Sequence, residues 1–257
     1  MTQEEREKAL IAYLLKENLD YSNISIPENS EERKQLLRGL VNVRPPKAIS
    51  EAFLSLQDEY LKEELRKRGI VTLAETEEKE KDIYLWQGDI TRLQVEAIVN
   101  AANSGMTGCY VPSHNCIDNC IHTFAGVQLR AECAQLMKKQ GYDEPTGRAK
   151  ITSAYNLPSR FVIHTVGPII DKAVSVEAEE LLASCYLSSL RLAEKNKCSS
   201  IAFCCISTGV FRFPNHRAAE IAVKTVREYK RNTGSGIKVV FNVWKDEDKE
   251  IYEDLLG

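Results

Sequence analysis

Apolar residues recur at two different spacings along this chain, and the change of spacing divides it in two. Up to about residue 72 they recur every three to four positions, as on one face of a helix. Beyond that point they gather in short runs separated by longer amphipathic stretches. Short apolar runs that alternate with helices are typical of βαβ units. The pattern therefore predicts an all-helical segment followed by an α/β domain.

Three helices are predicted in the first part. The first covers about Glu4 to Lys16, the second follows a cap at Ser30 and stops before Pro45, and the third runs from about Ser50 to Lys67. These helices carry no cluster of reactive side chains. We expect them to pack on the α/β domain as a helical cap, and the alternative is a lid or a docking surface for a partner.

The charged run from Thr76 to Asp82 is interpreted as a solvated boundary, so the helical extension is placed at 1–72 and the second domain at 73–257. The strands expected beyond it are Ile83 to Gln87, Ala97 to Asn100, Ala149 to Tyr155, Phe161 to Val166, Ile201 to Ile206 and Ile237 to Val243. The expected helices are Cys116 to Gln140, Val176 to Asn196, Asn215 to Arg231 and Asp246 to Leu255. This alternation predicts a mostly parallel sheet with helices on both faces.

Composition narrows the possible partners and location. The net charge of −3 and the pI near 5.9 argue against nucleic acid as a partner. No apolar run approaches the roughly 18 residues that a membrane span needs, and the mixed charges of MTQEEREKAL do not form a signal peptide. We therefore expect a cytoplasmic protein that binds no membrane and keeps its eight cysteines reduced.

The stretch from Asn100 to Gly126 concentrates the chemistry of the chain. Cys109, His114 and Cys116 form a C-x4-H-x-C cluster of ligand types that suit zinc. Three ligands leave a fourth position open, as in catalytic zinc sites. A structural site would need a fourth ligand from Cys120 or His122, and the third alternative is that no metal binds. His122 is expected to hold the loop by a hydrogen bond instead.

Other loops that follow predicted strands should meet this stretch, because ligands bind beyond the carboxyl ends of the strands in such sheets. In GDIT, Asp89 can accept a hydrogen bond from an amino group, although a turn or cap role is the alternative. In STGVFRFP, backbone N–H groups of Ser207, Thr208 and Gly209 precede a helix and can cradle phosphate oxygens.

Together these motifs carry a family resemblance. GDIT, VNAANS, CIDNCIHTFAG, PTGRAKITSAYNLPSRFVIHTVGP and ISTGVFRFP resemble the signatures of macrodomains in order and spacing, from about Tyr84 to the C-terminus. The chain is similar to the members that hydrolyse mono-ADP-ribose from proteins. Its C-x4-H-x-C insertion and helical extension resemble their zinc-dependent bacterial branch. The resemblance implies an α/β/α sandwich with a mixed, mostly parallel sheet, and a hydrolase with one Zn²⁺ per chain that releases ADP-ribose.

The resemblance also implies roles for single residues. Asp89 would accept the adenine amino group beside a backbone donor from Ile90. Asn103 would hydrogen-bond the distal ribose, and Asp118 would be the catalytic aspartate, although it can instead merely cap its helix. The diphosphate would be wrapped by Ser207, Thr208, Gly209, Val210 and Phe211. Two departures are noted: GCYVPSHNC replaces the glycine run of metal-free relatives, and Arg212 replaces a glycine common in the diphosphate loop.

Alternative functions remain open at this level. An ADP-ribose reader would need the adenine and diphosphate loops without zinc or Asp118, and an enzyme of free ADP-ribose derivatives would share the whole site. The partners that the resemblance implies are ADP-ribose and a mono-ADP-ribosylated protein. The usual gene neighbourhood of the family suggests a lipoyl-carrier protein modified by a sirtuin-like transferase.

Overall fold

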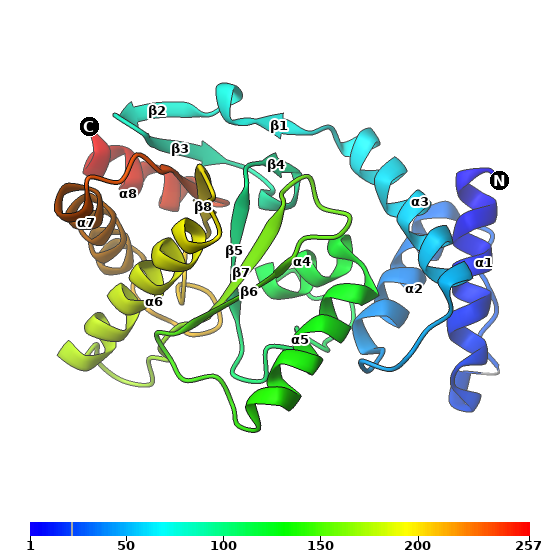
Figure 1. The fold of residues 1–257 in the computed structure, drawn as a ribbon. Coiled ribbons are helices and arrows are strands. Elements are labelled where there is room, and N and C mark those ends of the chain that lie inside the picture. Colours follow the sequence, from blue (N-terminus) through cyan, green and yellow to red (C-terminus); the bar gives the residue numbers. More distant parts are fainter. Residues whose placement is uncertain (22) are drawn as a thin grey trace.

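The computed structural model describes residues 1–21 and 23–257 (Figure 1). The N-terminal part contains α1 (Gln3–Lys16), α2 (Ser30–Val43) and α3 (Glu51–Arg68). The strands that follow are β1 (Val71–Thr72), β2 (Glu77–Glu80), β3 (Ile83–Gln87), β4 (Leu93–Gln94), β5 (Ala97–Ala102), β6 (Ala149–Ser153), β7 (Phe161–Val166), β8 (Ser200–Phe203) and β9 (Lys238–Val243). The later helices are α4 (Ile117–Ala125), α5 (Val127–Gln140), α6 (Val176–Lys195), α7 (Asn215–Thr233) and α8 (Asp246–Leu256).

A seven-stranded sheet of order β2-β3-β9-β8-β5-β7-β6 forms the centre of the molecule. Its inner pairs are parallel, and the two edge strands, β2 and β6, pair antiparallel with their neighbours. Helices α6, α7 and α8 cover one face, and α4 and α5 cover the other (Figure 1). The predicted α/β/α sandwich with a mixed, mostly parallel sheet is confirmed.

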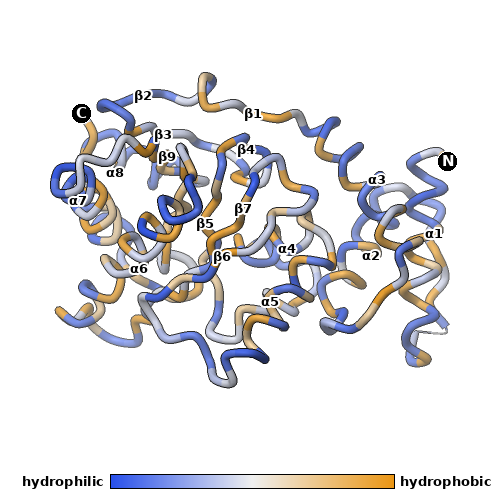
Figure 2. The backbone as a smooth tube through the Cα atoms, viewed as in Figure 1, coloured by the Kyte–Doolittle hydropathy of each residue, from blue (hydrophilic) through white to orange (hydrophobic). Residues whose placement is uncertain are grey.

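The sheet is held by an apolar core that the sequence pattern identifies. Ala97, Ile98 and Val99 of β5 are fully buried, as expected for a central parallel strand that is covered on both faces. Figure 2 shows β5 as hydrophobic and the edge strand β2 as hydrophilic. Among the helices of the described residues, none has the length and apolar character that crossing a bilayer requires.

The three N-terminal helices pack together and against α4 and α5 (Figure 1). They have a hydrophobic cluster of their own, which includes Leu10, Leu40 and Phe53 and which Val127 of α5 joins. The expected packing of these helices on the α/β domain is therefore confirmed. The cap of α2 differs from the prediction, because Asn29 accepts from the backbone of Glu31 and Glu32 and Ser30 is the first helical residue.

The sequence predicts a solvated boundary at Thr76 to Asp82, whereas in the structure Glu77–Glu80 of this run forms strand β2. It pairs with β3 at the edge of the sheet. Its glutamates carry no strand preference, but Glu80 pairs with Arg227 of α7, and charged side chains are common on edge strands because they discourage aggregation. Tertiary contacts therefore override the local pattern.

The single long helix predicted from Cys116 to Gln140 is also wrong, since Gly126 divides it into α4 and α5. Gly126 has φ 98°, and a Cβ atom there would lie 2.6 Å from the side-chain nitrogen of Gln57. Gln57 belongs to α3, and its Oε1 accepts a hydrogen bond from the backbone N–H of Val127 at 3.0 Å. A side chain of the N-terminal helices thus occupies the break.

Candidate functional site

The informative loops meet at one edge of the sheet. Strands β3, β5, β7 and β8 are connected through parallel pairs, so the loops that follow them lie at the same end. The loops after β7 and β8 are in direct contact, because a Cβ atom on Gly167 would lie 2.0 Å from Ser207 Oγ. The predicted convergence of these loops is what the backbone shows.

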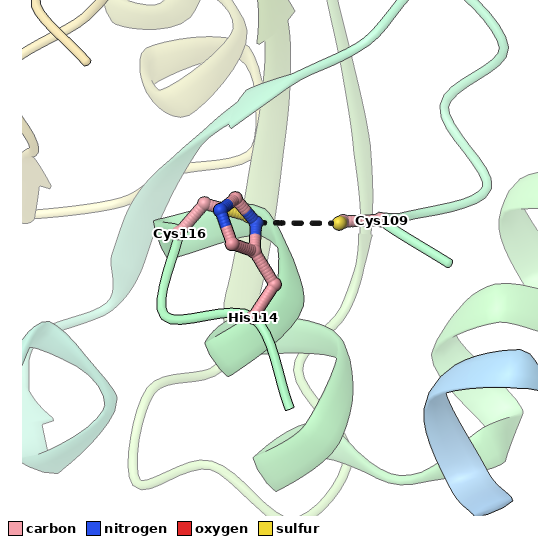
Figure 3. A group of neighbouring side chains, drawn as sticks. All are labelled: Cys109, His114 and Cys116. Atoms are coloured by element: carbon pink, nitrogen blue, oxygen red, sulfur yellow. Dashed lines mark hydrogen bonds between the residues drawn. The ribbon is translucent and has the colours of Figure 1, made fainter. Parts of the chain in front are cut away.

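The candidate metal cluster lies in the loop between β5 and α4. Atoms Cys109 Sγ, His114 Nδ1 or Nε2 and Cys116 Sγ all lie within 4.8 Å of one another. Figure 3 shows the His114 ring facing the sulfur of Cys109, and Sγ and Nδ1 are 3.6 Å apart. Two ligands held at about 2.3 and 2.0–2.1 Å by a tetrahedral zinc ion would be separated by about this distance.

The chemistry of these residues also fits a metal. Burial raises the pKa of the Cys116 thiol to about 12, and the neighbouring Cys109 and Asp118 add to the shift. A bound cation would favour the thiolate instead. Cys116 is also the N-cap of α4, where its sulfur accepts from the backbone N–H of Asn119 at 3.4 Å. The helix start therefore fixes the direction of this ligand.

The remaining candidates for a fourth ligand lie apart from the cluster. Cys120 contacts Arg38 Nη2 at 3.6 Å and does not belong to the group of three. His122 is buried, and within residues 1–21 and 23–257 neither of its ring nitrogens finds a hydrogen-bond partner. The predicted hydrogen bond from His122 to the loop is therefore wrong. The fold does bring together the predicted three-ligand set Cys109, His114 and Cys116, and it places His122 in a separate, fully buried group with Cys133 and His164.

Asp118 and Asn103 lie side by side next to this loop. Asn103 Nδ2 donates to Asp118 Oδ2 at 3.3 Å and to the carbonyl of Gly108 at 3.2 Å. Asn100 Nδ2 donates to the other carboxylate oxygen at 2.8 Å. Burial raises the pKa of Asp118 to about 6, against hydrogen bonds from the two asparagines and the charge of Arg130. The carboxylate is fixed by side chains of β5 and its loop, and it does not cap its helix.

Asn100 is a site residue that the sequence analysis did not single out. It interrupts the otherwise apolar strand β5 and is fully buried, so its polar side chain was the available signal. Its amide also faces Nδ1 of His164 at 3.1 Å, while Nε2 of that ring lies 3.0 Å from Thr152 Oγ1. His164 is therefore buried, and both of its ring nitrogens have a polar neighbour.

Asp89 lies at the start of the short helical turn Ile90–Arg92. Its Oδ1 accepts from the backbone N–H of Thr91 at 3.0 Å and from its hydroxyl at 2.7 Å. Its Oδ2 accepts from Arg68 Nη1 at 2.9 Å. Asp89 thus has the cap role that was the alternative, and Oδ2, which accepts one hydrogen bond, keeps a further lone pair for a ligand.

Arg68 is the second residue that the sequence analysis missed. It ends α3, where basic side chains are common because of the helix dipole, so the sequence gives no signal of its contact with Asp89. Its guanidinium lies 3.7 Å from the centre of the Phe124 ring. The N-terminal helices therefore reach the GDIT loop.

The loop from Ser207 to Phe211 has the free donors that an anion site requires. Within the part of the chain that the structure describes, the backbone N–H groups of Gly209, Val210 and Phe211 donate to no protein acceptor. Ser207 adopts φ 67°, and its carbonyl accepts from Phe213 N at 3.0 Å, which curls the loop. Successive unpaired N–H groups in a curled loop favour phosphate oxygens.

Arg212 follows this loop in a conformation that favours glycine. Its φ is 58°, and its guanidinium pairs with Asp171 at 3.0 Å on the surface. The residue that replaces the expected glycine therefore adopts a backbone conformation that a glycine would adopt more readily.

Comparison with known proteins agrees with this geometry. The family pattern of the Macro domain matches residues 99–222. A protein-ADP-ribose hydrolase of Treponema medium is 56% identical over 100% of both chains. Another, of Staphylococcus aureus (strain MSSA476), is 47% identical over 96% of this chain and 95% of its own. A macrodomain of Trypanosoma brucei, solved in complex with ADP-ribose, superimposes with a TM-score of 0.66 and 30% identity, over 86% of this chain and 95% of that one.

The fold and the loops at the strand ends define a macrodomain. The chain belongs to the Macro domain family, and the Treponema medium and Staphylococcus aureus relatives, which match 100% and 96% of it, are named protein-ADP-ribose hydrolases.

Proposed function

We propose that this chain is a zinc-dependent hydrolase that removes mono-ADP-ribose from modified proteins and releases ADP-ribose. One observation carries the proposal: the Cys109, His114 and Cys116 cluster lies beside the paired side chains of Asn103 and Asp118 at the ligand-binding edge of the sheet. The names of the full-length relatives support the hydrolase part. The three-ligand set supports the zinc part, because catalytic zinc sites keep a position open.

The loops divide the substrate between them in this proposal. Asp89 and the backbone of Ile90 bind the adenine, and the loop from Ser207 to Phe211 binds the diphosphate through its free N–H groups. Asn103 then orients the distal ribose, whose anomeric carbon carries the bond to the protein. The adenine and diphosphate loops fix the substrate before the reaction, which lowers the entropic part of the barrier.

Asp118 acts at the scissile bond. Its carboxylate is held on both oxygens by Asn100 and Asn103, so it can orient a water molecule and accept its proton without first reorganising. Bound zinc would supply Lewis-acid chemistry, either by polarising a substrate oxygen or by acidifying a water molecule. The protein residues that would hold it are Cys109, His114 and Cys116.

A substrate panel tests the reaction. The purified protein is incubated with a mono-ADP-ribosylated protein, with free ADP-ribose phosphate and with acetylated ADP-ribose, and released ADP-ribose is measured. Turnover of the modified protein at the highest kcat/KM supports the proposal. Tight ADP-ribose binding without turnover of any substrate would identify a reader instead, and preference for a free derivative would identify a metabolite hydrolase.

We extend the proposal to a lipoyl-carrier protein modified by a sirtuin-like transferase as the target, which the family resemblance supports. Mass spectrometry of such a carrier, modified by the transferase and then exposed to this protein, tests the extension. Removal of ADP-ribose faster than from an unrelated modified protein is expected. Equal rates on both would contradict a dedicated target.

A further inference from the structure

The loop that carries the three proposed ligands has little regular structure of its own. From Cys109 to Cys116 its backbone makes one internal hydrogen bond, from His114 N to Val111 O at 3.3 Å, in the described residues. Ser113, next to a ligand, has a positive φ of 54°, which is unfavourable for a residue other than glycine. Contacts from outside the loop must therefore hold this shape.

Two side chains of α2, in the N-terminal extension, supply such contacts. Asn42 Oδ1 accepts from the backbone N–H of Ser113 at 2.9 Å. Arg38 Nη2 donates to the carbonyl of His114 at 2.8 Å. Both bonds fall on the backbone next to or at the His114 ligand, and both come from residues more than 70 positions away in sequence.

The same two side chains connect the loop to α4. Asn42 is fully buried, and its Nδ2 donates to Thr123 Oγ1 at 2.9 Å. The Thr123 hydroxyl donates in turn to the carbonyl of Asn119 at 2.7 Å, one turn earlier in α4. Arg38 Nη2 also contacts Asn119 Oδ1 at 3.1 Å. Cys116, the third proposed ligand, caps α4. These bonds therefore fix the position of the loop relative to Cys116.

A reciprocal contact ties α2 to the first ligand. Arg130 of α5 donates through Nη1 to the carbonyls of Asn42 and Arg44, at 2.7 Å each, where α2 ends. Through Nη2 it donates to the carbonyl of Cys109 at 3.3 Å. One guanidinium thus satisfies free carbonyls at the helix end and holds the residue that begins the metal loop.

We propose that α2 of the N-terminal extension is part of the metal centre, with Arg38 and Asn42 as positioning residues for the ligand loop. The inference rests on the proposed zinc site and gives the extension a role in it. Residues that hydrogen-bond to metal ligands and orient them typically change metal affinity by about 10–100-fold when they are removed. The extension therefore controls how tightly zinc is held.

Zinc affinity, measured by competition with a chromophoric chelator on the full chain, tests the inference. Arg38→Met keeps most of the aliphatic stem and removes the donor to His114, and it should weaken zinc binding by about 10–100-fold. Arg38→Lys can still donate one hydrogen bond and should recover much of that loss. Gln35→Ala, at an exposed position on the same helix, is the matched control and should bind zinc as the wild type does.

A second variant tests the Asn42 arm independently. Thr123→Val removes the hydroxyl that accepts a hydrogen bond from Asn42 Nδ2, and it keeps nearly the same side-chain size. It should therefore also lower zinc affinity. Melting temperatures with excess chelator show whether each variant is folded without metal. If Arg38→Met does not fold, Thr123→Val decides.

The possible failures are distinct. If the wild-type protein binds no zinc, the proposed zinc site is wrong. If the wild type binds zinc and the folded Arg38→Met and Thr123→Val variants bind it within about twofold of the wild type, the zinc site stands and the role of α2 is refuted.

Discussion

Arg68 Nη1 lies 2.9 Å from Asp89 Oδ2, so the last turn of the N-terminal helices pairs with the residue expected to bind adenine. Both side chains are partly shielded, with 25% and 28% of their surfaces exposed. The pair places a helical extension, for which the sequence suggested no chemistry, at one end of the candidate site. The metal loop at the other end receives Arg38 and Asn42 from the same extension.

Asp89→Ala should weaken ADP-ribose binding by about 1–3 kcal/mol, because the adenine amino group would then lack the carboxylate acceptor that the proposed binding mode gives it. Isothermal titration calorimetry measures the effect. An unchanged affinity would remove Asp89 from the binding site.

Arg68→Ala should weaken ADP-ribose binding by about 1 kcal/mol through Asp89, since loss of the ion pair frees the carboxylate to move. The effect should vanish when Asp89 is already alanine, which a double-mutant cycle by calorimetry would show. Arg66→Ala, in the same helical turn with 75% of its side chain exposed, is the control and should bind normally. Additive effects of the Arg68 and Asp89 changes would contradict a role through Asp89.

Asp118→Ala should lower turnover by about 10²-fold or more while ADP-ribose affinity and zinc content stay near the wild-type values. Other loops hold the adenine and diphosphate, and Cys116 rather than Asp118 caps α4. Single-turnover rates on folded, zinc-loaded protein are the measurement. A rate close to that of the wild type would leave Asp118 with a structural role only.

Gly167→Ala should disturb the diphosphate loop, because the added methyl group would lie 2.0 Å from Ser207 Oγ. We expect weaker ADP-ribose binding, by at least about tenfold, in a protein that still folds. Gly236→Ala is the matched control, since its Cβ would meet nothing within 4 Å. Calorimetry on both variants compares the two glycines, and equal affinities would refute the close contact.

His164 should make the fold sensitive to acid. Burial lowers its pKa to about 3, whereas an unfolded histidine takes up a proton near pH 6.5. The unfolded state therefore binds more protons between these values, and stability falls as the pH drops through that window. The contribution is about 1.4 kcal/mol per pH unit.

Urea unfolding at several pH values between about 6.5 and 4 measures this slope. His164→Gln removes the titrating ring and should make the slope shallower by one proton. Asp118, whose raised pKa acts in the opposite direction, is present in both proteins and cancels in the comparison. Equal slopes for the two proteins would show that His164 does not titrate differently in the folded state.

Local patterns in the sequence predicted much of the fold. Strands β3 and β7 coincide with the apolar runs Ile83 to Gln87 and Phe161 to Val166, because burial on both faces produces such runs. The break at Gly126 was missed because a lone glycine is compatible with a helix, and the contact with Gln57, 69 positions earlier, is visible only in the fold. Strand β2 was missed because its glutamates do not favour a strand. It is stabilised by pairing with β3 and by the contact of Glu80 with Arg227.

In the candidate site, too, local features were predicted from the sequence and long-range contacts were not. Cys109, His114 and Cys116 come from one short segment, so their spacing was enough to group them. The contacts of Asn100, Arg38 and Arg68 join elements that are distant in sequence, and only Asn100 had a local signal, its polar side chain in an apolar strand. The proposed ligand-binding residues could therefore be predicted from motifs. The residues that position them could be identified only in the folded structure.

Zinc dependence is tested most directly by measuring de-ADP-ribosylation before chelation, after chelation and after zinc is restored, with the metal content of each sample determined in parallel. We predict about one zinc per chain, loss of most activity with the metal, and recovery when one equivalent returns. The Cys116→Ser and Cys109→Ser variants should neither hold the metal tightly nor recover. Full activity in metal-free wild-type protein would contradict a zinc-dependent hydrolase.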